Sequence, residues 1–225
     1  MVLTVLDAAA FLWFLLCWIG YALVVDYSPL RHRSVVAAMD YYRQEWIRQC
    51  VRRDNRMPDV NILRSLQRSV QFYATTTMFV LAGLVAVLGS ADKAMTLLRE
   101  VEFLAPVGRL TLEVKLVVLL VMFIYAFFKF SWSNRLYNYT AVAIGAIPPA
   151  AECTEMPERA AGPAAELVCR ATRHFTSGLR AYYFGLGLLS WFVHPLAFIA
   201  ASALVVAVLF RREFRSGALR KMNER

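Results

Sequence analysis

Histidine and cysteine are the residue types in this sequence best suited to catalysis or metal binding, and their spacing argues against both. The chain holds three histidines and four cysteines among 225 residues. An active or metal site needs such groups placed so that they act on one another. The sequence contains no HExxH motif, no glycine-rich phosphate loop, no GxSxG motif and no CxxC pair. We therefore expect neither an enzyme nor a bound cofactor or metal.

Two ionisable residues, Lys115 and His194, fall inside or at the edge of long apolar stretches. Ionisable groups within a membrane are costly and by default indicate function. As a haem ligand, His194 would need a second histidine at similar depth, and the sequence has none. A lone histidine there is more often a hydrogen-bonded packing residue. Lys115 either extends its ammonium group to the interface or faces a wet interior cavity. Lys115 and His194 together form the candidate intramembrane polar site.

Five cations near the expected ends of the membrane segments are candidate contacts for an anion or a lipid headgroup. Two interpretations stay open. The cations pair with nearby acids and lipid phosphates and lock the helices at the membrane boundary, or they converge on a positive vestibule for an anionic solute or headgroup. The five residues are Arg64, Arg68, Lys129, Arg135 and Arg180.

Four apolar segments must position these residues. The clearest runs from Ala181 to Phe210 without a single acid, lysine or arginine. A bilayer core about 30 Å thick needs about 20 apolar helical residues, and a soluble helix is rarely apolar on all faces for so long. Hydrophobic residues also make up 59% of the chain and charged residues only 18%, unlike a typical soluble domain. The predicted spans cover residues 3–25, 72–90, 112–132 and 182–210.

Amphipathic helices are predicted over residues 34–54, 59–71 and 163–178. The apolar face of the first is formed by Val35, Met39, Tyr42, Trp46 and Cys50, and arginines occupy its other faces. Such a helix lies on an anionic leaflet or packs against a partner helix. The helix over 59–71 is expected to continue into the second span. The predicted fold class is an all-α integral membrane protein, with four transmembrane helices and additional interfacial or cytoplasmic helices in one domain over residues 1–225.

The distribution of basic residues leaves the orientation in conflict. Four crossings put both termini on one side of the membrane. The positive-inside rule favours an outside N-terminus, because the two arginine-rich connections then face the cytoplasm. The basic tail over residues 211–225 argues against that orientation. Pro195 is expected to kink the last helix, and a hairpin at His194-Pro195 would instead return the tail to the inside.

The net charge of +9, from 25 lysines and arginines against 16 acids, limits the classes of partner. In a membrane protein such an excess marks cytoplasmic loops and contact with anionic lipid. No nucleic-acid recognition motif accompanies the arginines. We expect a bilayer containing anionic lipids and a second copy or another membrane protein as partners, and no nucleic acid.

Several stretches carry a likeness to a known family: LRSLQRSVQFYATTTMFVLAGL in the second span, YAFFKFSWSNRLYNY after the third, and GLRAYYFGLGLLSWFVHP with RREFRSGALR at the fourth. They resemble a bacterial family of membrane proteins catalogued as Domain of Unknown Function 599. The resemblance covers nearly the whole chain. It implies a multi-pass helical protein of the bacterial inner membrane and implies no activity, substrate or cofactor.

Two functional hypotheses follow from these observations. The first is a small helical structural or interaction subunit that oligomerises or associates with another membrane complex and with anionic lipid. Its basis is the amphipathic helices, the small residues Ala82 and Ala86 on one helix face, and the lack of reactive motifs. The alternative is an oligomeric channel or transporter with a basic vestibule for an anionic solute.

Overall fold

The described part of the chain is helical throughout. The computed structural model describes residues 4–29, 32, 34–91, 95, 108–150, 157–215 and 217. The helices are α1 (Val5–Tyr27), α2 (Val35–Val51), α3 (Met57–Gly89), α5 (Arg109–Gly145), α6 (Pro157–Leu188), the short 3-10 helix η3 (Leu189–Phe192) and α7 (Pro195–Phe214). Among the described residues there is no strand.

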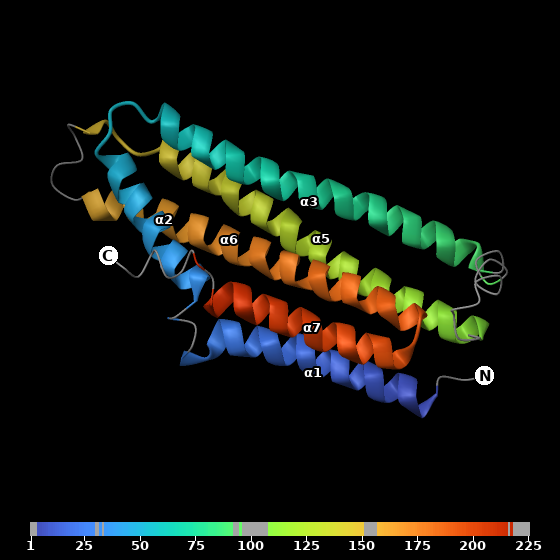
Figure 1. The fold of residues 1–225 in the computed structure, drawn as a ribbon. Coiled ribbons are helices and arrows are strands. Elements are labelled where there is room, and N and C mark those ends of the chain that lie inside the picture. Colours follow the sequence, from blue (N-terminus) through green and yellow to red (C-terminus); the bar gives the residue numbers. More distant parts are fainter. Residues whose placement is uncertain are drawn as a thin grey trace.

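The long helices form an elongated bundle, and α2 lies across one end of it (Figure 1). Four of them, α1, α3, α5 and α7, are long and apolar enough to cross a membrane. The prediction of an all-α membrane protein with four such helices is therefore confirmed. The long helices also carry many large apolar side chains on their outer faces, as lipid-facing surfaces require.

Several predicted boundaries change because helices continue past the apolar stretches. The amphipathic helix over 59–71 and the second span form one continuous helix, α3, as expected. The third span, expected over 112–132, is the middle of the 37-residue helix α5. The amphipathic helix expected over 34–54 is α2, which ends at Val51.

The predicted fourth span over 182–210 is divided. Helix α6 ends at Leu188, η3 follows, and α7 begins at Pro195 and returns antiparallel to α6 (Figure 1). His194 has φ −161° and ψ 142°, the extended conformation favoured before proline. Pro195 then occupies the first turn of α7, where its missing N–H costs nothing. The proline thus starts a new helix rather than kinking an existing one, and the hairpin alternative is the one adopted.

Helix α6 unites the amphipathic helix expected over 163–178 with the start of the expected fourth span. It runs along the bundle against α5, its most extensive partner. Because α6 runs along the bundle and α7 returns beside α1, α1 begins near one end of the bundle and α7 ends toward the other (Figure 1). The expectation of both termini on one side is therefore wrong for the described helices. The end of α7 lies beside α2, so the arginines Arg211 and Arg212 gather with the other basic segments.

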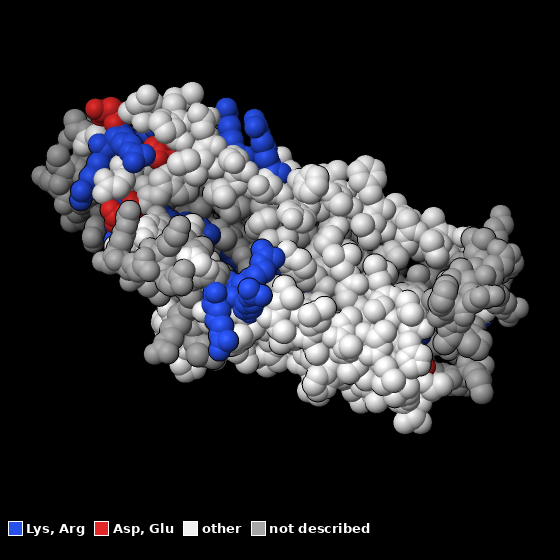
Figure 2. Space-filling view, viewed as in Figure 1, with Lys and Arg blue, Asp and Glu red and all other residues white. Residues whose placement is uncertain are grey.

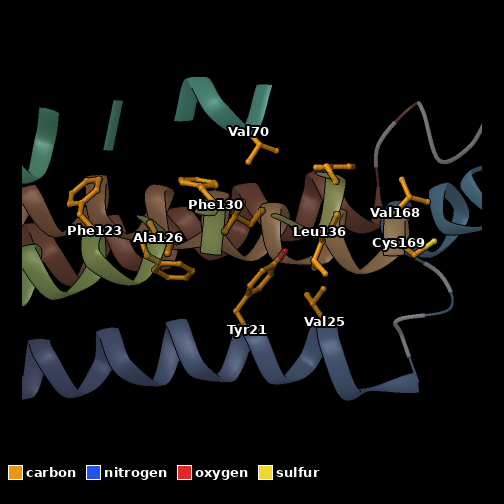
Figure 3. Packing of buried hydrophobic residues seen from close by; sticks show 14 of the residues in the cluster. Tyr21, Val25, Val70, Phe123, Ala126, Phe130, Leu136, Val168 and Cys169 are labelled. Carbon is orange, nitrogen blue, oxygen red and sulfur yellow. The ribbon is translucent and has the colours of Figure 1, made fainter. Parts of the chain in front are cut away.

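Aromatic rings fill the space between the helices. Phe14 of α1 lies 5.1 Å from Phe198 of α7 and 5.9 Å from Phe184 of α6, measured between ring centroids. In Figure 3, Tyr21 projects from α1 toward α5 and α6, and Val70 projects from α3 toward the same pair. The hydrophobic core is therefore continuous and is built by side chains from α1, α3, α5, α6 and α7.

Two glycines of α6 allow its close approach to α5. A Cβ atom built at Gly178 would lie 2.6 Å from the ring of Phe130, and one at Gly185 would lie 3.2 Å from the ring of Phe123. Both rings are buried. The α5–α6 contact thus depends on a glycine facing each ring.

We expect Gly178→Ala to destabilise the protein by about 1–3 kcal/mol, because the added methyl group overpacks a buried contact. The matched control is Gly83→Ala on α3, where a Cβ meets nothing within 4 Å and alanine is the better helix former. Thermal unfolding in mild detergent measures both. Equal melting temperatures for the two variants would contradict the close α5–α6 packing.

The hairpin also predicts on which side of the membrane a reporter enzyme fused to the chain lies. If the basic end of the bundle faces the cytoplasm, alkaline phosphatase fused after Val193 is active outside, and a fusion after Arg225 is inactive. A single span over 182–210 with an outside N-terminus gives the opposite result for the Arg225 fusion. Phosphatase activity, normalised to expression of each fusion, distinguishes the two topologies.

Candidate functional site

Arg180 of α6 is buried where the end of α1 reaches it. Its Nη2 atom donates to Asp26 Oδ1 at 2.8 Å and lies 3.4 Å from Ser177 Oγ. The residue is 8% exposed. Its Nε and Nη1 atoms are buried and have no hydrogen-bond partner among the described residues. A buried charge with unused donors is costly, so this residue is the first candidate for a binding role.

A cavity of about 240 Å³ adjoins this pair. It lies between the end of α1, the start of α2 and the middle of α6. Its lining residues are Val25, Asp26, Tyr27, Ser34, Val36, Arg173, Thr176, Ser177 and Arg180. The lining therefore combines two guanidinium groups, four hydroxyl groups and one carboxylate.

The Asp26–Arg180 pair lies at a depth suited to a membrane surface. Asp7 and Asp26 are separated by about 28 Å along α1 at about 1.5 Å per residue. The intervening segment has no charged residue and matches the hydrocarbon thickness of about 30 Å. With α1 across a bilayer, the cavity would lie at the level of the lipid headgroups.

Beyond this level, Asp40 of α2 holds α2 against α6. Its carboxylate accepts from Arg43 at 3.0 Å and from Arg173 Nη2 at 2.9 Å. Asp40 is buried and Arg173 is about half exposed. Since Arg173 also lines the cavity, this ion pair fixes one wall of it.

A second buried acid, Asp59 of α3, ties α2 to α3. It accepts from Trp46 Nε1 at 2.7 Å and from Arg53 Nη1 at 2.8 Å. Burial, together with the negative charge of Asp59, raises the pKa of the Cys50 thiol to about 11. Cys50 therefore stays neutral at physiological pH and is a poor nucleophile or metal ligand.

The other four candidate cations have separate environments. Arg64 and Arg68 are exposed on α3. Lys129 lies over the ring of Tyr125 at 5.2 Å, and Arg135 donates to Tyr139 Oη at 2.8 Å, in both cases within α5. Among the described residues, Arg180 is the only one of the five whose side chain is paired with an acid on another helix. Of the five, Arg180 lines the cavity of about 240 Å³, and the convergence of all five on one vestibule stays a prediction.

At the opposite end of the bundle, Lys115 is buried and paired. Its Nζ atom donates to the carbonyl of Trp191 at 2.8 Å and lies 3.5 Å from Asp7 Oδ1. The indole N–H of Trp191 donates to Asp7 Oδ1 at 2.9 Å. Thr4 caps α1 and also donates to Asp7. This cluster joins α1, α5 and η3, so Lys115 faces the protein interior rather than extending to the interface.

His194 takes no part in that cluster among the described contacts. It is exposed, and its Nδ1 atom accepts from the N–H of Leu196 at 3.1 Å, which caps α7. Among the described residues, no group of three or more histidines, cysteines or acids could hold a metal ion. Cys153 and the predicted tail beyond 217 lie outside the described residues.

Sequence reasoning did not assign Asp7 and Asp40 as partners of Lys115 and Arg173. Asp7 had a usable signal, since it is an acid within an apolar run and such residues usually have a partner. Asp40 carried no such sequence signal, because it lies in a segment that is already rich in charged residues. Which basic residue it would meet depends on how α2 docks on α6.

The fold and these charged clusters define a multi-pass helical membrane protein with a strongly basic end. The sequence profile of the family described as "Protein of unknown function, DUF599" matches residues 9–218. The chain belongs to this family, as its sequence resemblance indicated. No curated protein and no solved structure matches it.

Breaking the Asp7–Lys115 pair is expected to destabilise the bundle. Lys115→Met leaves Asp7 buried without its counter-charge, and Asp7→Asn leaves Lys115 buried without its counter-charge. Each substitution is therefore expected to lower the free energy of unfolding by about 3–5 kcal/mol. The double variant is expected to lose less than the sum of the two, because neither charge remains. Thermal unfolding in detergent measures this coupling.

The control for this cycle is Lys129→Met, which removes a partly exposed lysine of the same helix. It should change the melting temperature little. Additive losses in the Asp7→Asn and Lys115→Met double variant would show that the two side chains do not interact.

Proposed function

We propose that this protein is a structural subunit of the bacterial inner membrane that binds anionic lipid headgroups at its basic end and associates with a second copy or another membrane protein. The observation that carries the proposal is the one-sided distribution of charge. Lysine and arginine side chains gather over the end of the bundle that holds α2 (Figure 2). A cluster of this kind at a membrane surface attracts anionic lipid.

The packing of the bundle supports a structural role. The ring of Phe198 packs between two other rings in the interior, with its centroid 5.0 Å from that of Trp191 and 5.1 Å from that of Phe14. Thr76 and Thr77 of α3 donate to carbonyls one turn earlier in the same helix. Their hydroxyl groups are therefore satisfied locally, and they supply no argument for a polar path through the chain.

The outer face of α3 supports association with another helix. This helix packs mainly on α5, and little of its apolar stretch is buried. Ala82 and Ala86, which were expected to mediate helix packing, are exposed together with Gly83. Small residues on an open membrane-facing surface allow a neighbouring helix to approach closely. A second copy of the chain or another membrane protein would bury this face.

An anion channel or transporter formed by an oligomer is the second candidate. It is favoured by a cavity of about 450 Å³ between α2 and α6, whose lining includes Arg48, Arg170 and Arg173. Vesicles containing the purified protein provide a direct comparison. Selective anion flux would favour the transporter over the structural subunit.

The lipid-binding role predicts a loss on charge reversal at the headgroup level. Arg64→Glu with Arg68→Glu is expected to weaken retention of anionic lipid by the purified protein at least about 30-fold, since each of the two basic residues near the surface contributes about 1 kcal/mol. Lipid analysis after extraction in mild detergent gives the ratio of anionic to zwitterionic lipid.

Arg48→Glu with Arg52→Glu is the matched control. It makes the same change in charge at exposed Arg48 of α2 and at exposed Arg52, the C-cap of that helix, at the end of the bundle farther from the apolar stretches. Equal retention in both double variants, or retention of no anionic lipid by the unmodified protein, would refute headgroup binding.

A further inference from the structure

The cavity beside Arg180 has the features of a site for one anion. We propose that it binds a single phosphate group, supplied by the headgroup of an anionic lipid or by free phosphate. The proposal refines the lipid-binding function described above by assigning one site within the basic end. It begins with the guanidinium of Arg180, nine-tenths buried, whose Nε and Nη1 atoms have no partner among the described residues.

Hydroxyl groups and a helix start complete the site. Ser34 is 1% exposed, caps α2 and lines the cavity together with Ser177. The Ser34 hydroxyl accepts from the N–H of Ala37 and can therefore donate to a phosphate oxygen. The Ser177 hydroxyl already donates to the carbonyl of Arg173. The N–H of Val36 in the first turn of α2 already binds a carboxylate oxygen of Glu213 at 3.2 Å. This contact shows that the start of α2 attracts a negative group, as helix N-termini do.

The local charges leave a positive excess. Arg180 is paired with Asp26, and Arg173 and Arg43 share the single carboxylate of Asp40. Glu213, whose carboxylate lies at the start of α2, and its neighbour Arg212 add one charge of each sign. Four guanidinium groups therefore face three carboxylates around the cavity. One further negative charge would balance them, and a phosphate offers oxygen acceptors that suit guanidinium donors.

Size and depth limit what can occupy the cavity. At about 240 Å³ it is smaller than the pockets of 300–1,000 Å³ typical of drug-sized ligands. It suits a headgroup phosphate and is too small for a nucleotide. Its level, about 28 Å along α1 from Asp7, is that at which phospholipid phosphates lie.

Two sources of phosphate can be separated with the full-length protein in nanodiscs. One arm compares thermal unfolding in discs of phosphatidylcholine with discs that also contain phosphatidylglycerol. The other adds inorganic phosphate to the phosphatidylcholine discs, with sodium chloride at equal ionic strength as its control. Stabilisation by phosphatidylglycerol alone assigns the site to lipid, and stabilisation by inorganic phosphate assigns it to the free anion. Stabilisation by neither overturns the proposal.

Two substitutions with opposite expected effects identify the site. Arg180→Gln should weaken binding of the stabilising anion about ten-fold or more, because it removes a charged donor. Asp26→Asn should strengthen binding several-fold, because it removes the competing carboxylate and frees Nη2. Arg170→Gln is the control on the same helix, exposed and outside the cavity. Native mass spectrometry of retained lipid measures the same series independently.

The direction of the Asp26→Asn effect decides between a binding site and a purely structural ion pair. A structural pair predicts lower stability and no gain in anion binding, and that result would overturn the site even if Arg180→Gln fails to fold. The outcome is separable from the general lipid-binding role. Loss of anionic lipid in the Arg64 and Arg68 variant together with no effect at Arg180 and Asp26 would leave that role intact and remove this site.

Discussion

The pairing of buried charges between helices is the constraint on which the arrangement of this bundle depends. Lipid offers no water to charged groups, so each must meet a partner or reach the surface. Asp7 meets Lys115 at one end of the apolar zone, and Asp26 meets Arg180 at the other. These contacts set the relative heights of α1, α5 and α6. They also define an apolar thickness that matches a bilayer core.

Helix α6 shows how this constraint acts on a single helix. Its polar residues could not face lipid, and they pack against α5. There Ser133 of α5 donates to the carbonyl of Ala171, and the hydroxyl of Tyr137 is hydrogen-bonded to that of Thr172. Because α6 crosses the bundle and α7 returns, the end of α7 joins α2 at the basic end. Positive charge is thereby concentrated at one end of the bundle, and this is the basis of the proposed lipid binding. Among the described residues, Arg180 is left with donors in excess of its partners.

Much of the fold could be predicted from the order of residues. The apolar runs that contain Phe14, Phe79 and Met122 identify membrane helices because their length and composition are unusual for a soluble chain. The spacing of Trp46 and Cys50 identified α2 in the same way. The hairpin at His194-Pro195 was recognised only as an alternative, since a proline inside an apolar run is compatible with either a kink or a helix start.

By itself, the sequence determined the class of protein, the identities of the apolar helices and the excess of basic charge, because these depend on local composition and periodicity. Only the tertiary structure decided which charges meet. Lys115 with Asp7, Arg173 with Asp40 and Arg180 with Asp26 are separated by more than a hundred residues each. Their pairing follows from helix packing and from the glycine contacts between α6 and α5, which no local pattern encodes. The cavity beside Arg180 exists for the same reason, since its walls come from α1 and α2 and from α6, which begins more than a hundred residues later.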